Sequence, residues 1–93
     1  MKYHVRYSDN AGDIDYEQTL EYDGPVEGLL KKLCEEHEAR LQQTMKNLSE
    51  RAPERFKYSG RKAYRFEVSG NEARIYTIED DINVLIINAE PAR

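Results

Sequence analysis

The sequence predicts an α+β fold, in which an antiparallel sheet of about five strands packs against one long helix. Three observations predict it. Two segments near the N-terminus alternate apolar and polar residues, the stretch from Pro25 to Ser49 then carries apolar residues at helical spacing, and three more alternating segments follow. The 93 residues suit a single domain, 1–93, and the expected order of elements is ββαβββ.

Residues 2–8 and 16–22 are the first two expected strands, and the turn-forming residues 8–13 separate them. Antiparallel pairing in one particular register places apolar residues together on one face and opposite charges together on the other. The expected pairs are Tyr7 with Tyr16, Arg6 with Glu17, Tyr3 with Leu20 and Lys2 with Glu21. A shift by one residue breaks both kinds of match, so the sequence predicts this register.

A long helix is expected next. Pro25 suits the first helical position, and Asp23 or Gly24 can cap the helix. One apolar stripe contains Val26, Leu29, Leu30, Leu33, Cys34, Leu41, Met45 and Leu48. Pro53 disfavours helix in the residue before it, so the helix should end near residues 49–52. Such a helix is about 38 Å long, so it either extends beyond the sheet or is broken.

The last three expected strands are residues 62–69, 72–79 and 82–88, with turns at Gly70-Asn71 and Asp80-Asp81. Two-residue turns fix the register. The face that meets the helix should carry the rows Phe66–Ile75–Ile86 and Tyr64–Thr77–Val84. The opposite face should carry the rows Arg65–Tyr76–Leu85 and Glu67–Arg74–Ile87, extended by Ile78.

This second face mixes cationic, aromatic and aliphatic residues, whereas a solvated sheet face is normally polar. We therefore expect something to cover it. The loop 52–61, a second copy of the chain in a homodimer, and a foreign partner are the three candidates, since interfaces favour such mixtures of Tyr and Arg with aliphatic residues.

Charge is segregated along the chain. The net charge is −5 over residues 1–45, +4 over residues 46–76 and −3 over residues 77–93. Polarised charge steers partners. We expect the acidic segments of residues 9–38, and in the helix Glu35, Glu36 and Glu38, to mimic nucleic-acid phosphates and engage a basic target.

The basic middle of the chain also suits a phosphate backbone with stacked bases. Its residues are Arg51, Arg55, Lys57, Arg61, Lys62 and Arg65, interleaved with Phe56, Tyr58 and Tyr64. The whole chain is nevertheless acidic, with a pI near 5.2. We therefore favour a protein or nucleoprotein partner over direct nucleic-acid binding.

No complete catalytic, metal or cofactor signature is present in the sequence. Cys34 and His37 have helical i, i+3 spacing, but a zinc site needs a second pair of ligands. Cys34 belongs to the apolar stripe, which predicts a structural thiol. The single Cys cannot form an internal disulfide, and no apolar run approaches the roughly 18 residues of a membrane span. We expect a cytoplasmic protein without a cofactor or a membrane partner.

The last third of the chain repeats a pattern of arginine, tyrosine and apolar residues. Its segments are Tyr64-Arg65-Phe66-Glu67-Val68, Ala73-Arg74-Ile75-Tyr76 and Val84-Leu85-Ile86-Ile87, followed by a final Arg93. In this pattern residues 60–93 resemble the C-terminal half of the RelE/ParE superfamily of bacterial toxins. The resemblance implies that Arg65 and Arg74 contact the scissile phosphate of messenger RNA, with Tyr76 beside them. Members usually have one strand and two helices before the sheet and are strongly basic, unlike this acidic chain.

The residues favour a binding protein over an enzyme. The leading hypothesis is a small inhibitor or adaptor that occludes a protein or nucleoprotein partner. The alternatives are a RelE/ParE-like toxin acting on messenger RNA at the ribosome and a structural homodimer module. The candidate binding residues are Arg65, Arg74, Tyr76, Leu85, Ile87, Glu35, Glu36 and Glu38, and no residue is assigned to catalysis or to a metal.

Overall fold

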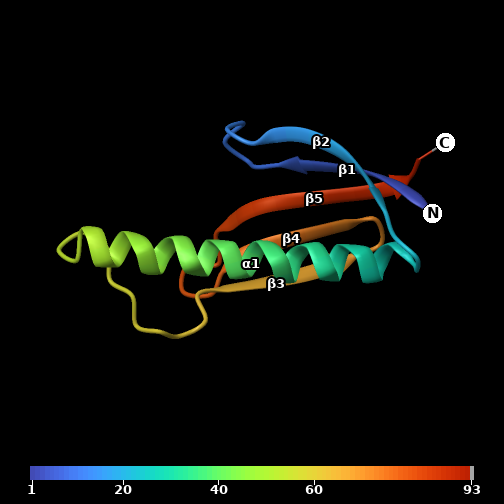
Figure 1. Cartoon of the computed structure of the whole chain (residues 1–93). Helices are drawn as coiled ribbons and strands as arrows, with labels where there is room; N and C mark the ends of the chain where they lie inside the picture. Colours follow the sequence, from blue (N-terminus) through green and yellow to red (C-terminus); the bar gives the residue numbers. More distant parts are fainter. Residues whose placement is uncertain (93) are drawn as a thin grey trace.

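The computed structural model describes residues 1–92 and has the expected α+β architecture (Figure 1). Its elements are β1 (Lys2–Ser8), β2 (Asp15–Glu21), α1 (Val26–Arg51), β3 (Tyr64–Ser69), β4 (Glu72–Thr77) and β5 (Asn83–Pro91). The strands form one antiparallel sheet in the order β2-β1-β5-β4-β3, and α1 lies across one face of it. The N-terminal hairpin joins the other strands because β1 pairs with β5.

The β1–β2 hairpin has the register that the sequence predicts. Tyr7 pairs with Tyr16 and Arg6 with Glu17, so the apolar side chains share one face. Asp9 closes the turn by accepting a hydrogen bond from the amide of Ile14, at 3.2 Å. The match of apolar and charged pairs therefore determines the pairing of this hairpin, despite its long turn.

The helix α1 is unbroken and extends beyond the sheet (Figure 1). Its 26 residues span about 39 Å, whereas the nine residues of β5 span about 30 Å. Its fully buried residues all lie in the first half: Leu29, Leu30, Leu33 and Cys34. Pro25 is the residue that precedes the helix, and no side chain caps it, which corrects the expected cap at Asp23 or Gly24.

The register between β4 and β5 differs by one residue from the expectation. Ile75 lies opposite Leu85, and a bulge interrupts the ladder between Ile75 and Tyr76. The turn between β4 and β5 is longer than the expected two residues. It places Asn83 opposite Tyr76, two residues from the expected partner Leu85, and the bulge then reduces this shift to one residue. A one-residue shift exchanges the two faces of a strand, so Leu85 and Ile87 are buried on the helix side.

One helix covers only part of this sheet. A helix is about 10 Å wide, whereas five strands about 4.8 Å apart span some 20 Å or more. The helix runs over β3, β4 and β5. The helix therefore does not lie over the β1–β2 hairpin but beside it. Tyr16, in the edge strand β2, remains 47% exposed.

Candidate functional site

The open face, which is the sheet face opposite α1, is polar. Its central rows are Glu17–Arg6–Asn88–Glu72–Ser69 and Asp15–Ser8–Ile86–Arg74–Glu67. The expected apolar residues Leu85 and Ile87 are missing from it, because the bulge in β5 turns them toward the helix. The expected position of Leu85 and Ile87 on this face was therefore wrong. Ile86 and Tyr76 are on the open face, among polar and charged residues.

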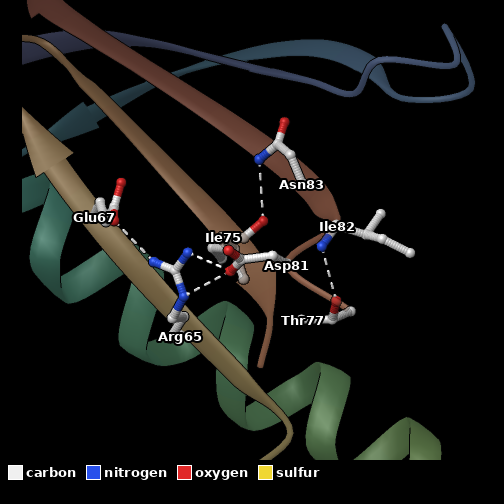
Figure 2. A network of polar contacts seen from close by, with 7 residues as sticks. All are labelled: Arg65, Glu67, Ile75, Thr77, Asp81, Ile82 and Asn83. Carbon is white, nitrogen blue, oxygen red and sulfur yellow. Dashed lines mark hydrogen bonds and ion pairs between the residues drawn. The ribbon is translucent and has the colours of Figure 1, made fainter. Parts of the chain in front are cut away.

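The arginines of the open face are engaged with carboxylates of the same face. Arg65 donates hydrogen bonds to Asp81 and, at 2.9 Å, to Glu67 (Figure 2). Its guanidinium lies 4.5 Å from the centre of the Tyr76 ring. Arg74 donates to Glu72 at 2.9 Å. The bonds to Asp81 and to Glu72 are the main reason why the pKa values of Arg65 and Arg74 are raised.

The turn between β4 and β5 positions Asp81 for this contact (Figure 2). Asp81 has a left-handed backbone, with φ of 57°, which Asp tolerates better than most residues. Thr77 Oγ1 accepts a hydrogen bond from the Ile82 amide at 3.0 Å, and Asn83 donates to the carbonyl of Ile75 at 3.1 Å. The sequence analysis missed this network, because it read Asp80-Asp81 as a two-residue turn.

The three acidic residues proposed on α1 do not form one surface. Glu35 and Glu36 are exposed. The side chain of Glu38 is only 12% exposed, lies 3.7 Å from the amine of Lys62, and has a buried oxygen without a hydrogen-bond partner. Glu38 therefore faces the segment that returns to β3, whereas Glu36 acts on Tyr7 on the other side of the helix and contributes to raising its pKa.

A groove lies where α1 passes the β1–β2 hairpin. We call it the hairpin groove; its volume is about 410 Å³, and it is lined by Asp13, Ile14, Asp15, Tyr16, His37, Leu41, Val84 and Leu85. Tyr16 stacks on Tyr7 with ring centres 4.5 Å apart, and Tyr7 lies 5.2 Å from the ring of His37. Four of the lining residues are aliphatic and one is aromatic, so the groove offers apolar area beside an acidic hairpin turn.

The charged residues that line the hairpin groove are acidic, Asp13 and Asp15, and Glu36 and Arg40 of α1 act on its residue His37 with opposite charge. Asp13 and Glu36 are exposed, and among residues 1–92 neither forms an ion pair, whereas Asp15 pairs with Arg6 at 3.2 Å. Burial and then the charge of Arg40 lower the pKa of His37, against the opposing effect of Glu36. The groove therefore suits a cationic ligand with apolar side chains.

Sequence reasoning did not find the hairpin groove, because its residues come from the hairpin, the helix and β5. One signal was available. A single helix cannot cover five strands, so some apolar residues on the helix side had to remain beside it. The sequence also placed Leu85 on the wrong face, and that residue contributes to the floor of the groove.

The end of α1 and the segment that returns to β3, residues 42–63, form a projection that we call the arm (Figure 1). Five of its cations are exposed and form no ion pair within the described part of the chain: Lys46, Arg51, Arg55, Lys57 and Arg61. A second pocket, of about 520 Å³, lies between the arm and the β4–β5 turn. Its lining includes basic residues of the arm and acidic residues of the turn, so it has no single charge.

The other chemistry is limited. In the described range, no three His, Cys, Asp or Glu side chains gather closely enough to hold a metal ion. The helix found in residues 1–92 is too polar to cross a membrane. Arg93, part of the resemblance to the toxins, lies outside the described residues. Comparisons with protein-family models, curated proteins and solved structures give no match.

Proposed function

We propose that this protein is a non-enzymatic binding protein, an inhibitor or adaptor, whose hairpin groove receives a basic and partly apolar segment of a protein partner. The observation that carries the proposal is the groove itself, in which apolar side chains lie beside the unpaired carboxylate of Asp13. Glu36 precedes the lining residue His37 on α1, and its charge acts on that residue. Apolar area supplies affinity, and complementary charge supplies orientation and a fast encounter.

The choice between a protein and a nucleic acid rests on charge. Acidic groups repel phosphates, and a polyanion would have to approach the unpaired carboxylate of Asp13 to reach the groove. A lysine- or arginine-rich segment meets no such barrier. A partner surface that normally holds nucleic acid has this character, so occluding such a surface is compatible with the inhibitor role.

The test is the binding of two labelled helical peptides, one built from Lys and Leu and its counterpart built from Glu and Leu, measured by fluorescence anisotropy. The basic peptide should bind and the acidic peptide should not. The double variant Asp13→Lys/Glu36→Lys should weaken binding about tenfold or more. Its matched control is Glu79→Lys/Glu90→Lys, which changes the net charge equally at exposed positions outside the groove. Equal weakening by both variants would reject the groove as the site.

The toxin alternative has less physical support. Arg65 and Arg74, the residues that the resemblance would place at the scissile phosphate, are engaged with Asp81, Glu67 and Glu72. A phosphate would have to displace these carboxylates. Growth arrest on expression that is lost in Arg74→Ala would favour the toxin, and harmless expression at a high level would favour the binding protein.

A further inference from the structure

The arm is basic, whereas the charged residues that line the hairpin groove are acidic. Residues 46–62 contain six basic and two acidic residues, a net charge of +4. Residues 9–17, which form the hairpin turn and the start of β2, contain four acidic and no basic residues. Asp15 and Glu17 lie close to Arg6 and His4, whereas Asp13, at the groove, is exposed and forms no ion pair within residues 1–92. The chain therefore has a basic, partly apolar segment of its own that matches the ligand expected for the groove, and this inference rests on the proposed function.

Intramolecular occupancy is ruled out by the shape of the arm. Leu41, the residue before the arm, lines the groove. The end of α1 projects beyond the sheet (Figure 1). Gln42 holds the return segment against the helix, because its side chain bonds Tyr58 Oη at 3.2 Å and the carbonyl of Arg61 at 2.7 Å. The basic residues of the arm cannot fold back into the groove of the same molecule without breaking these contacts.

The apolar stripe of α1 continues into the arm. Leu41, Met45, Leu48 and Ala52 are each half-buried and follow at spacings of four, three and four residues. This is the spacing by which two helices pack along a shared seam. Beyond Cys34 no residue of α1 is fully buried, so the stripe still has surface available for a second helix.

A two-fold arrangement of two copies covers the apolar stripe and pairs the opposite charges at the same time. Ten residues separate Leu41 from Arg51, a distance of about 15 Å along the helix. If two arms pack antiparallel with Met45 of one copy beside Leu48 of the other, the tip of each arm reaches the point where the groove of the other copy begins. The contact between the two helices and the contact between arm and groove then each occur twice, as a two-fold dimer requires.

We infer that two copies of this chain form a homodimer in which the basic arm of each copy lies in the hairpin groove of the other. The dimer occupies the groove that a protein partner would use, so partner binding and self-association compete. Since the contact joins unlike charges near the surface, raising the salt concentration weakens the dimer.

The test uses two charge-reversed variants. The groove variant is Asp13→Lys/Glu36→Lys, and the arm variant is Arg55→Glu/Lys57→Glu. All four side chains are exposed and make no ion pair or side-chain hydrogen bond within residues 1–92, so the fold should tolerate both variants. The matched control for the arm variant is Lys31→Glu/Lys32→Glu, the same charge change at exposed positions of α1 outside the arm and the groove.

Sedimentation velocity at micromolar concentration should show a dimer for the native chain and the control, and monomers for the groove and arm variants alone. Mixing the groove variant with the arm variant in equal amounts should restore a dimer, because both contacts then join unlike charges. The basic groove of the first variant meets the acidic arm of the second, and the basic arm of the first meets the native groove of the second. A native chain that stays monomeric, variants that stay dimeric, or a mixture that stays monomeric would overturn the inference.

The fate of the proposed function is read separately, from the arm variant, whose groove is intact. If the arm variant binds the basic peptide and the native chain stays monomeric, the proposed function is supported and the homodimer is rejected. Absence of peptide binding to the monomeric arm variant would remove the proposed function, and the mixing experiment would still decide on the dimer.

Discussion

Gln42 of α1 and Ala63, the residue before β3, are joined by a hydrogen bond of 3.0 Å from the Ala63 amide to Gln42 Oε1. The amide nitrogen of the same side chain donates to Tyr58 and to the carbonyl of Arg61. One side chain thus closes the loop that connects the helix to β3. The arm owes its shape to this single residue more than to any apolar contact, since none of its side chains is fully buried.

Replacing Gln42 by Ala should therefore loosen the arm. The three hydrogen bonds are partly accessible to water, so we expect the free energy of unfolding to fall by about 1 kcal/mol, rather than by three full bond contributions. Amide hydrogen exchange at residues 58–63 should become faster. The control is Gln43→Ala, whose side chain bonds only Asn47 on the helix surface. Unchanged exchange in Gln42→Ala would contradict the role given to this residue.

Asn83 should stabilise the register of β5. Its side-chain nitrogen donates to the carbonyls of Ile75 and Leu85, at 3.1 Å each, across the bulge. Asn83→Ala leaves both carbonyls without this donor, so we expect urea denaturation to show a loss of about 1–2 kcal/mol. Asn88→Ala on the open face serves as the control, because Asn88 is exposed and makes no side-chain hydrogen bond within the described residues. Equal losses in the two variants would count against the bulge as the cause.

The bulge also explains what the sequence analysis could and could not predict. The element order and the β1–β2 register follow from local alternation and from opposite charges, and the structure confirms them. The face of β5 depends on the bulge opposite Ile75 and Tyr76, and a run such as Val84-Leu85-Ile86-Ile87 is apolar in both registers. Alternation therefore cannot decide it, and Leu85 and Ile87 were placed on the wrong face.

The candidate site was harder to predict than the fold for a related reason. Glu35, Glu36 and Glu38 are neighbours in sequence, yet the helix separates Glu36 from Glu38 and directs Glu38 toward Lys62. Asp13 and His37 are distant in sequence, yet both line the hairpin groove. Local patterns identify elements, whereas a groove depends on how far the helix is offset across the sheet, and no local pattern records that offset.

Cys34 should be chemically inert while the protein is folded. Its side chain is fully buried, and burial, with smaller effects of Glu38 and Glu35, raises its pKa to about 12. Only the thiolate reacts with alkylating agents. Iodoacetamide should therefore fail to modify the native chain near neutral pH and should modify it readily in concentrated urea. Rapid labelling of the native chain at the rate of a free thiol would contradict the buried position.

His37 should make stability depend on pH. Burial lowers its pKa in the folded chain below the ordinary value of about 6.5 that it takes when unfolded. The unfolded chain therefore binds more protons as the pH falls through that value, and the contribution of His37 to stability, complete above it, is lost progressively below it. Urea denaturation from about pH 8 to about pH 5.5 should show a smaller fall in stability for His37→Gln than for the native chain. His4→Gln should retain the native fall, because it leaves the contact of His37 with Tyr7 intact. Equal pH dependence in the native chain and His37→Gln would show that other groups govern stability in this range.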